Sequence, residues 1–249
     1  LAWLLKSSPP THAHGLEMEI AERRGVPHEA VLAGGGSSDL IHAALRHWVQ
    51  PGESVLLPQP TYSEYPFVLG AIGAKVSDIE RDGLTWSIAL ITEALAAGPA
   101  HCVLVNPNNP TGSHHAVEAL LAVVDAHPRT RFWVDETYCD FILGRPTLER
   151  AAAQRRNLVV CKSMSKAYAL SGARVGYLVG HPSSLATLRA RGVPWSVGAV
   201  AQLAAIRALG AEAYYQGQWE RTAALREALA AGLRDLGWHV LGGEANFQD

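Results

Sequence analysis

The chain has little positive charge to spare. Only four lysines occur in 249 residues (Lys6, Lys75, Lys162 and Lys166), and 21 basic residues face 23 acidic ones, for a formal net charge of -2. Without a basic surplus, the chain is poorly suited to neutralise the phosphates of a duplex, which argues against a nucleic-acid partner. Hydrophobic residues make up 48% of the chain, enough for a real core, so intrinsic disorder is excluded as its main character.

Long apolar runs and cysteines are also scarce. No run approaches the ~20 apolar residues needed to span a bilayer, and we expect no signal peptide before the first motif. The three cysteines, Cys102, Cys139 and Cys161, lie in apolar stretches without the spacing of metal ligands. This pattern is typical of buried thiols in a reducing compartment. We therefore expect a soluble, cytoplasmic protein without a bound metal.

The two ends of the sequence suggest a longer protein. The sequence begins at Leu1 rather than a methionine, and it stops two residues after the apolar run 245–247. We expect that it is a piece of a chain that continues on both sides.

Short apolar runs alternate with segments of helical periodicity from about Val31 onward. Such runs, bounded by turn residues, are typical of strands buried on both faces, and their alternation with helices predicts a mostly parallel α/β sheet. We expect a three-layer α/β sandwich with an N-terminal segment over 1–30, a large domain over 31–200, and a connecting helix with the start of a smaller domain over 201–249. The predicted strands are 54–57, 101–105, 131–134, 158–161, 175–179 and 238–241, and the predicted helices are 63–72, 116–126 and 200–236.

Polar residues follow three of the predicted strands directly. They are the segments 106–109, 135–136 and 163–166. Ligands of open α/β sheets bind outside the carboxyl ends of the strands, so these segments indicate one shared site. The alternative is that strand-to-helix loops are polar because their backbone must be hydrated. For three consecutive loops with these side chains, the shared site is the better interpretation.

Lys166 is the first candidate catalytic residue. It lies in the hydroxyl-rich segment 163–172, at a strand exit flanked by apolar residues. An amine in such a place can lose its proton and attack a carbonyl to form a Schiff base. The alternative is an ordinary surface lysine, which is how we interpret Lys162.

Asp135 is the second candidate, because it closes a strand whose last residues, 132–134, are all apolar. A desolvated carboxylate requires a cationic partner, either a pyridinium N–H or a buried arginine. Tyr138 lies three residues later, on the same side if a helical turn follows. Arg174 offers a planar fork suited to phosphate.

A glycine-rich turn over 34–36 leads into a predicted helix. Free amides at a helix start, with the hydroxyls of Ser37 and Ser38, would form an anion site. The spacing matches neither the dinucleotide fingerprint nor the P-loop. A flexible turn capped by Ser38 or Asp39 is the alternative.

Together these parts describe a site for pyridoxal 5′-phosphate: a lysine for its aldehyde, an acid for its ring nitrogen, and a turn with an arginine for its phosphate. On the segments 106–112, 134–138 and 163–166, with Arg174, the sequence resembles the fold-type I pyridoxal-phosphate enzymes of the class I/II aminotransferase superfamily. The resemblance runs from 15 to 247, and it is strongest to the histidinol-phosphate aminotransferase branch and its relative, threonine-phosphate decarboxylase.

This resemblance implies a role for each candidate residue. Lys166 would hold the cofactor and move the substrate α-proton, and Asp135 would keep the pyridinium nitrogen protonated. Asn109 and Tyr138 would hydrogen-bond the 3-oxygen of the ring, and Tyr62 would stack on the ring face. The phosphate would be held by Gly36, Ser37, Ser163, Ser165 and Arg174.

The resemblance also implies features near the two ends of the chain. Asn246 would contact the substrate, whereas the arginine that reads the substrate carboxylate would lie beyond Asp249. The family is expected to form homodimers. The segment 11–15 stands where its members carry a tyrosine that reaches the partner subunit, which this sequence lacks there.

The leading prediction is an aminotransferase that moves an amino group, in two half-reactions, between an amino acid or amino-phosphate and a 2-oxo acid, with glutamate as the implied donor. A threonine-phosphate decarboxylase is the nearest alternative, and the segment 193–197 resembles that enzyme more. Two other classes stay open: a non-catalytic binding module that kept the fold, and a nucleotide-binding protein that uses the turn at Gly34.

Overall fold

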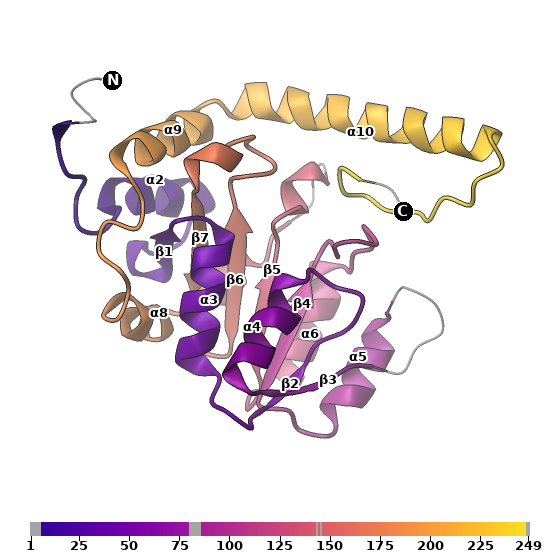
Figure 1. Cartoon of the computed structure of the whole chain (residues 1–249), viewed down its shortest axis with the longest axis horizontal. Helices are drawn as coiled ribbons and strands as arrows, with labels where there is room; N and C mark the ends of the chain where they lie inside the picture. Colours follow the sequence, from indigo (N-terminus) through magenta and orange to yellow (C-terminus); the bar gives the residue numbers. More distant parts are fainter. Residues whose placement is uncertain (1–5, 80–85, 143, 145, 248–249) are drawn as a thin grey trace.

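The computed structural model describes residues 6–79, 86–142, 144 and 146–247 of the chain. Its centre is a sheet of seven strands in the order β1-β7-β6-β5-β4-β2-β3 (Figure 1). β7 runs antiparallel to both neighbours, and the other four pairs are parallel, which confirms the predicted mostly parallel sheet. The strands are β1 (Val31–Gly34), β2 (Ser54–Leu56), β3 (Lys75–Ser77), β4 (His101–Val105), β5 (Arg131–Asp135), β6 (Leu158–Ser163) and β7 (Gly176–Gly180).

Helices cover both faces of this sheet, as the three-layer prediction requires. One face carries α3 (Ser37–Trp48), α4 (Glu64–Ile72) and α8 (Pro182–Arg189). The other face carries α2 (His14–Arg24), α5 (Ile88–Leu95), α6 (Val117–Ala126), α7 (Glu149–Ala152) and α9 (Ala199–Gly210). The remaining elements are the 3-10 turns η1 (His28–Ala30), η2 (Cys139–Phe141) and η3 (Ser171–Ala173) and the helix α10 (Glu212–Asp235).

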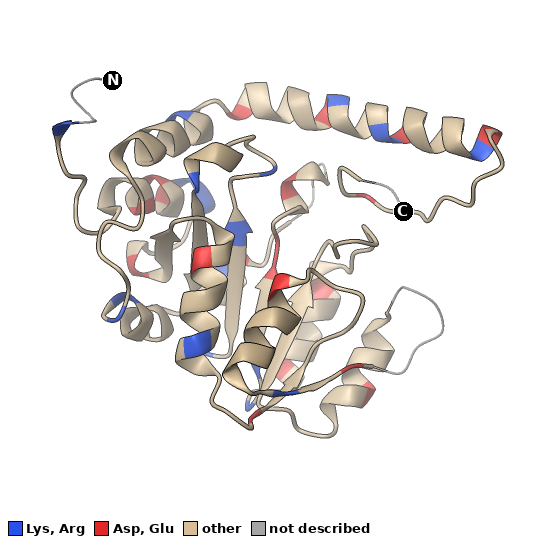
Figure 2. Cartoon of the chain, viewed as in Figure 1, with Lys and Arg blue, Asp and Glu red and all other residues tan. Residues whose placement is uncertain are grey.

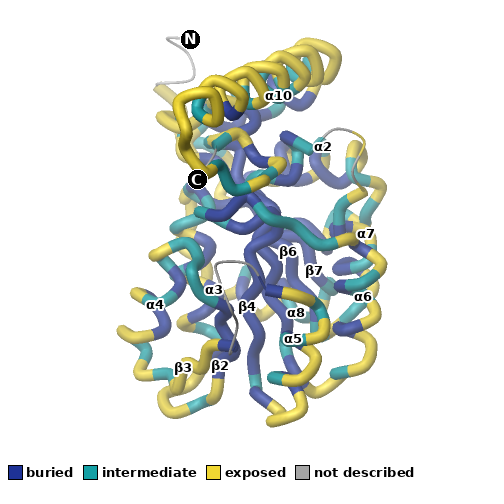
Figure 3. Tube along the Cα trace, turned by 90° about the vertical axis from the view of Figure 1, so that its right-hand side faces the viewer, coloured by how far each residue is buried: buried dark blue, intermediate teal, exposed yellow. Residues whose placement is uncertain are grey.

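The core consists of two apolar clusters separated by the sheet. Successive side chains of a strand point to opposite faces. Phe132 and Val134 of β5 therefore belong to the cluster that includes α2 and α6, whereas Trp133 belongs to the cluster that includes α3 and α4. By the same alternation Asp135 lies on the α4 side. The strands other than β3 form most of the buried interior of the molecule, whereas β3 is exposed at the sheet edge (Figure 3).

Two further predictions concern the cysteines and the membrane. All three cysteines are buried, as predicted, and none of them forms a disulfide. In the part of the chain that the structure describes, every helix is too short or too polar to cross a membrane.

The C-terminal part differs from the prediction. The helix predicted over 200–236 is divided at Ala211 into α9 and α10. α10 lies across one end of the sheet domain, and of its residues Ala230 alone is buried (Figures 1 and 3). The strand predicted at 238–241 is wrong: these residues form no regular element. Among the described residues none of the seven strands pairs with this segment, so its backbone has no neighbouring strand with which to form sheet hydrogen bonds.

Candidate active site

A hollow of about 100 Å³ lies at the carboxyl ends of β4 and β5. It is lined by residues from five separate segments: Ser37, Tyr62, Val105, Asn109, Asp135, Thr137, Tyr138 and Lys166. Six of these are residues singled out from the sequence. Lys166 and Asp135 border the same space, which is the arrangement that a small aromatic ring held between an amine and an acid requires.

The turn after β4 places Asn109 on the rim of the hollow. Asn106 fixes the turn from both sides: its Nδ2 donates to the carbonyl of His115 (3.1 Å), and its Oδ1 accepts from the His115 amide (2.8 Å). The Nδ2 of Asn108 donates to the Thr111 hydroxyl (3.0 Å). Because Asn106, Asn108 and Thr111 are themselves buried, these bonds hold the loop while Asn109 stays half-exposed.

Asp135 is buried, with 3% of its surface exposed. Its Oδ1 accepts from the amide of Thr137 (2.8 Å), and its Oδ2 accepts from the hydroxyl of Tyr65 (2.6 Å). The indole Nε1 of Trp133 donates in turn to the Tyr65 oxygen (2.8 Å). Burial raises the pKa of Asp135, and the hydrogen bonds from Thr137 and Tyr65 partly oppose that rise.

Tyr65 is a residue that sequence reasoning missed. It lies in α4 and is fully buried among apolar residues. Its position in the sequence is that of an ordinary core aromatic, and only the fold places its hydroxyl against Asp135. The partner expected for Asp135 was a cation, and the protein supplies a hydroxyl and an amide.

The residues predicted to bind phosphate lie next to one another, beside the hollow. Gly36 has φ +99° and comes directly before α3; a Cβ at this position would approach the Arg174 guanidinium to 2.5 Å. Arg174 Nη1 donates to the Ser165 hydroxyl (3.2 Å), and the Ser165 amide donates to the Ser163 hydroxyl (3.3 Å). Together with Ser37 at the first turn of α3, these groups form a concentration of donors suited to an anion.

Gly176 is a second residue that the sequence did not single out. A Cβ on this glycine of β7 would lie 2.8 Å from the amide nitrogen of Ser37 and 2.9 Å from the carbonyl carbon of Gly36. Any larger residue would push the glycine-rich turn away from the sheet. The absence of a side chain at Gly176 therefore sets the position of the turn.

The two lysines of this region differ in burial, and for Lys162 the burial is the opposite of what the sequence predicted. Lys166 is exposed, and its ammonium makes no hydrogen bond or ion pair with any residue in the described ranges. Lys162 was interpreted as a solvated lysine, which is wrong. It is 2% exposed and forms ion pairs with Asp140 (3.1 Å) and Glu136 (3.8 Å).

These ion pairs explain why Lys162 is buried. It lies on β6 and points to the sheet face opposite Asp135, where η2 brings Asp140 close. Burial alone lowers the pKa of a lysine, but the carboxylates, led by that of Asp140, raise the pKa of Lys162 well above its ordinary value. Burial likewise raises the pKa of Glu136, to about 7, although Lys162 opposes that rise.

Asn246 does not line the hollow. It is exposed, and its neighbour Phe247 packs edge-on against Tyr138, with ring centroids 5.0 Å apart. The last described residues therefore contact the wall of the hollow through Phe247.

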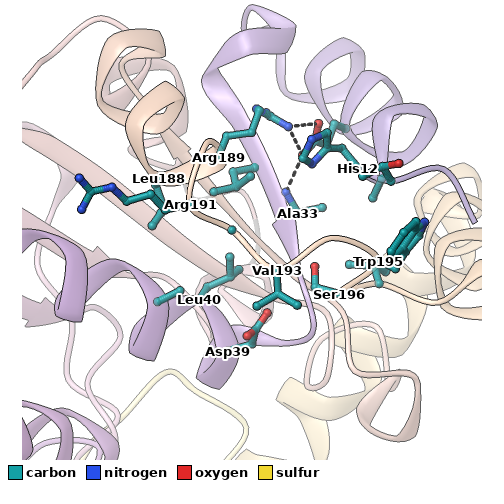
Figure 4. Close-up of a pocket in the computed structure, with 18 of the residues that line it drawn as sticks. His12, Ala33, Asp39, Leu40, Leu188, Arg189, Arg191, Val193, Trp195 and Ser196 are labelled. Carbon is teal, nitrogen blue, oxygen red and sulfur yellow. Dashed lines mark hydrogen bonds and ion pairs between the residues drawn. The ribbon is translucent and has the colours of Figure 1, made fainter.

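A second hollow, of about 350 Å³, lies between α2, β1, α3 and the segment before α9 (Figure 4). It shares no lining residue with the hollow at Lys166. Two of its charged groups pair with each other: Glu17 accepts from Arg189 Nη1 (2.8 Å), and Glu17 also accepts from the amide of Ala33 (3.0 Å). We assign these ion pairs a structural role, because they anchor α2 to β1 and α8.

The family described as aminotransferase class I and II matches residues 4–248. Histidinol-phosphate aminotransferase of Symbiobacterium thermophilum is 34% identical over 245 residues, which cover 96% of this chain and 66% of the relative. This chain thus spans about two thirds of the length of the curated relative.

Solved structures agree with this result. Histidinol-phosphate aminotransferase from Sinorhizobium meliloti, in complex with pyridoxal-5′-phosphate, has a TM-score of 0.89 at 23% identity, covering 97% of this chain and 67% of its own. L-threonine-O-3-phosphate decarboxylase from Porphyromonas gingivalis has a TM-score of 0.83 at 26% identity, covering 97% and 76%. The chain belongs to the class I and II aminotransferase family, and the family resemblance seen in the sequence is confirmed.

Proposed function

We propose that the chain is the cofactor-binding part of a pyridoxal-phosphate-dependent aminotransferase of the histidinol-phosphate type. The observation that carries this proposal is that Lys166 and Asp135, from different strand ends, line one hollow together with Asn109, Tyr138 and Tyr62. The stability of the fold does not require that the Lys166 amine lie without a hydrogen-bond or ion-pair partner beside the buried carboxylate of Asp135. The residues present therefore fit pyridoxal 5′-phosphate.

Each residue has a definite task in this proposal. When bound, the cofactor supplies an electron-withdrawing pyridinium ring that stabilises negative charge at the substrate α-carbon. Lys166 would hold the cofactor aldehyde through its Nζ and, once the substrate amine has replaced it there, its free amine would carry the α-proton. Asp135 accepts the ring N–H, and Tyr65 holds that carboxylate in place. Asn109 and Tyr138 are donors for the ring oxygen.

The remaining predicted residues hold the two ends of the ligand. Arg174, Ser163, Ser165, Ser37 and the turn at Gly36 would bind the phosphate, and Tyr62 would cover one ring face. Asn246 would contact the substrate, which requires it to turn from its exposed position toward Tyr138.

The proposed reaction moves an amino group from an amino acid or amino-phosphate to a 2-oxo acid, with glutamate as donor. Decarboxylation of threonine phosphate is the second candidate, because the decarboxylase structure shares the fold at 26% identity. Which bond at the α-carbon breaks depends on its alignment with the ring, and the same Lys166 and Asp135 serve both reactions.

We also propose a cytoplasmic homodimer. The buried free thiols support a reducing compartment. Val193 and Trp195, in the segment before α9, are 74% and 55% exposed, which supports a partner surface there. Elution of the full-length protein as a monomer at micromolar concentration would contradict the dimer.

Borohydride reduction followed by peptide mass mapping tests the central assignment. After incubation with the cofactor, we expect one pyridoxyl group on the peptide that contains Lys166 and none in Lys166→Ala. The matched control is Lys75→Ala, which removes an exposed lysine of β3 and should label normally. A chain that binds no cofactor, or that is labelled elsewhere, would instead favour a binding module.

Activity separates the two enzymatic candidates. The full-length protein is assayed with phosphorylated amines, aromatic amino acids and threonine phosphate, while 2-oxo acid formation and carbon dioxide release are followed together. We expect 2-oxo acid without carbon dioxide, and loss of at least 10³-fold of the rate in Lys166→Ala. Stoichiometric carbon dioxide from threonine phosphate would assign the decarboxylase.

A further inference from the structure

A basic groove lies at the opposite edge of the sheet from the hollow at Lys166. It has a volume of about 670 Å³ and runs between the end of α3, the start of β5 and α8. Arg131 opens β5 and Asp135 closes it, so the two sites are separated by four residues of strand, roughly 13 Å. The described residues that line the groove include no Asp or Glu; they are His47, Trp48, Arg131, Arg156, Ser183, Ser184, Thr187, Ala190 and Arg191.

Two guanidinium groups of this groove, those of Arg156 and Arg191, lack a carboxylate partner among the described residues, whereas the charge of Arg131 interacts with that of Glu53. Arg156 Nη1 donates to the Ser183 hydroxyl (3.2 Å), Arg191 Nη1 contacts His47 Nδ1 (3.4 Å), and Arg131 lies 5.0 Å from the Trp48 ring centroid. In the described ranges none of them comes within 4.0 Å of a carboxylate oxygen.

Other arginines of the chain are paired. Arg155, the neighbour of Arg156 in sequence, makes two bonds to Asp125 (2.7 and 2.9 Å), and Arg189 makes two bonds to Glu17 (3.0 and 2.8 Å). Figure 4 shows the guanidinium of Arg191 directed away from that of Arg189, although Arg191 also lines the second hollow. In a chain of net charge -2, two arginines without a carboxylate partner, next to Arg131, whose charge Glu53 partly offsets, form a local concentration of positive charge that composition does not explain.

The groove also supplies neutral hydrogen-bonding groups in fixed positions. The hydroxyl of Thr187 donates to the carbonyl of Ser184 (3.0 Å) and lies 3.1 Å from His47 Nε2. Burial first, and then the charges of Arg191 and Arg131, lower the pKa of His47, so the imidazole stays neutral beside the arginines. Ser183 and Ser184 lie in the first turn of α8, where the helix dipole favours an anion.

We propose that this groove binds the phosphate or diphosphate group of a small molecule, held by the forks of Arg156 and Arg191 against Arg131. A guanidinium fork matches the geometry of phosphoryl oxygens, and three such charges suit a group that carries two or more negative charges better than a single carboxylate. A nucleic acid is disfavoured as the ligand of this groove, because its binding would require an extended basic surface. Over the rest of the molecule, basic and acidic residues are mixed (Figure 2). The inference does not depend on the proposed function.

Calorimetric titration with sodium pyrophosphate tests this site. The chain is first saturated with pyridoxal 5′-phosphate, so that the donors around Arg174 are occupied, and ionic strength is kept constant. We expect the double variant Arg156→Ala/Arg191→Ala to bind pyrophosphate at least tenfold more weakly than the parent chain. Arg155→Ala, the matched control, should change the affinity by less than twofold because its partner is Asp125.

A further variant makes the outcomes decisive. Arg156→Lys/Arg191→Lys keeps the charge but removes the forks, and we expect it to lose at least threefold in affinity. The proposal fails if the parent does not bind up to 10 mM, if the double alanine variant binds like the parent, or if the lysine variant binds like the parent. Both arginines of the double variant are exposed, so an unchanged urea midpoint verifies its fold.

Discussion

Replacing Tyr65 with phenylalanine removes one oxygen from the centre of the candidate site. That oxygen donates to Asp135 Oδ2 at 2.6 Å and accepts from Trp133 Nε1 at 2.8 Å, and all three groups are buried. A hydrogen bond to a charged group contributes about 1.5–3 kcal/mol, and a buried donor left without an acceptor costs about 1–3 kcal/mol. We therefore expect Tyr65→Phe to lower the free energy of unfolding by roughly 2–5 kcal/mol at pH 8.

The pH dependence of this loss identifies its cause. Burial raises the pKa of Asp135, so the ionised carboxylate disfavours folding, and the stability gained from the neutral form is lost as pH rises through the raised pKa. The Tyr65 hydroxyl favours the ionised form, so its removal raises the pKa of Asp135 further. The difference between parent and variant should accordingly shrink as pH falls and Asp135 becomes protonated.

Urea unfolding of the cofactor-free chain at several pH values measures both effects. Tyr62→Phe is the matched control: its hydroxyl bonds Glu64 at 3.2 Å near the surface, and we expect a loss below about 0.5 kcal/mol. A loss of that same small size in Tyr65→Phe, or a loss that stays constant with pH, would refute the idea that Tyr65 acts on an ionised Asp135.

Four further variants probe neighbouring groups. Asp135→Asn should weaken cofactor binding about 10- to 150-fold, measured by equilibrium absorbance titration, because a charged hydrogen bond of about 1.5–3 kcal/mol is lost; an unchanged dissociation constant would contradict its role. Lys162→Ala should cost about 3–5 kcal/mol in urea unfolding, because Asp140 and Glu136 lose their buried partner; a cost like that of Lys75→Ala would argue against the ion pairs. The pKa of Glu136 is raised to about 7, so the folded state favours its neutral form. The contribution of Glu136 to the free energy of unfolding is therefore complete below pH 4.5 and is lost as pH rises through 7. Glu136→Gln should therefore gain up to roughly 3 kcal/mol relative to the parent between pH 5 and pH 8, and a pH-independent difference would disprove this. Gly36→Ala should be destabilised by about 1–3 kcal/mol and bind inorganic phosphate more weakly, since φ is +99° and Arg174 occupies the space of a Cβ; a neutral effect would show that the turn relaxes.

The sequence alone was informative where the chemistry is local. The strands β4, β5 and β6 are continuous apolar runs followed by polar turns, so the sheet and the edge that bears Asp135 and Lys166 could be predicted. β3 was not, because its three residues lie exposed at the sheet edge and have no apolar pattern.

What could not be predicted depends on partners that are distant in sequence. The sequence around Lys162 is that of a surface lysine, and only the fold places Asp140 and Glu136 beside its ammonium. The sequence around Tyr65 is that of a core aromatic, and only the fold places its hydroxyl against Asp135, 70 residues later. The segment 238–241 has the composition of a strand, but a strand also needs a neighbour to pair with. Each error arose from a property of the local residues that long-range packing overrides.

The pairing of β1 with β7 has a consequence for synthesis of the protein. β1 spans Val31–Gly34, and its partner begins at Gly176, about 145 residues later. At roughly 5–20 residues per second, the ribosome needs about 7–30 s to deliver the second strand after the first. During that interval the turn at Gly36 lacks the strand against which it packs, so the proposed phosphate-binding turn reaches its final position only after β7 emerges.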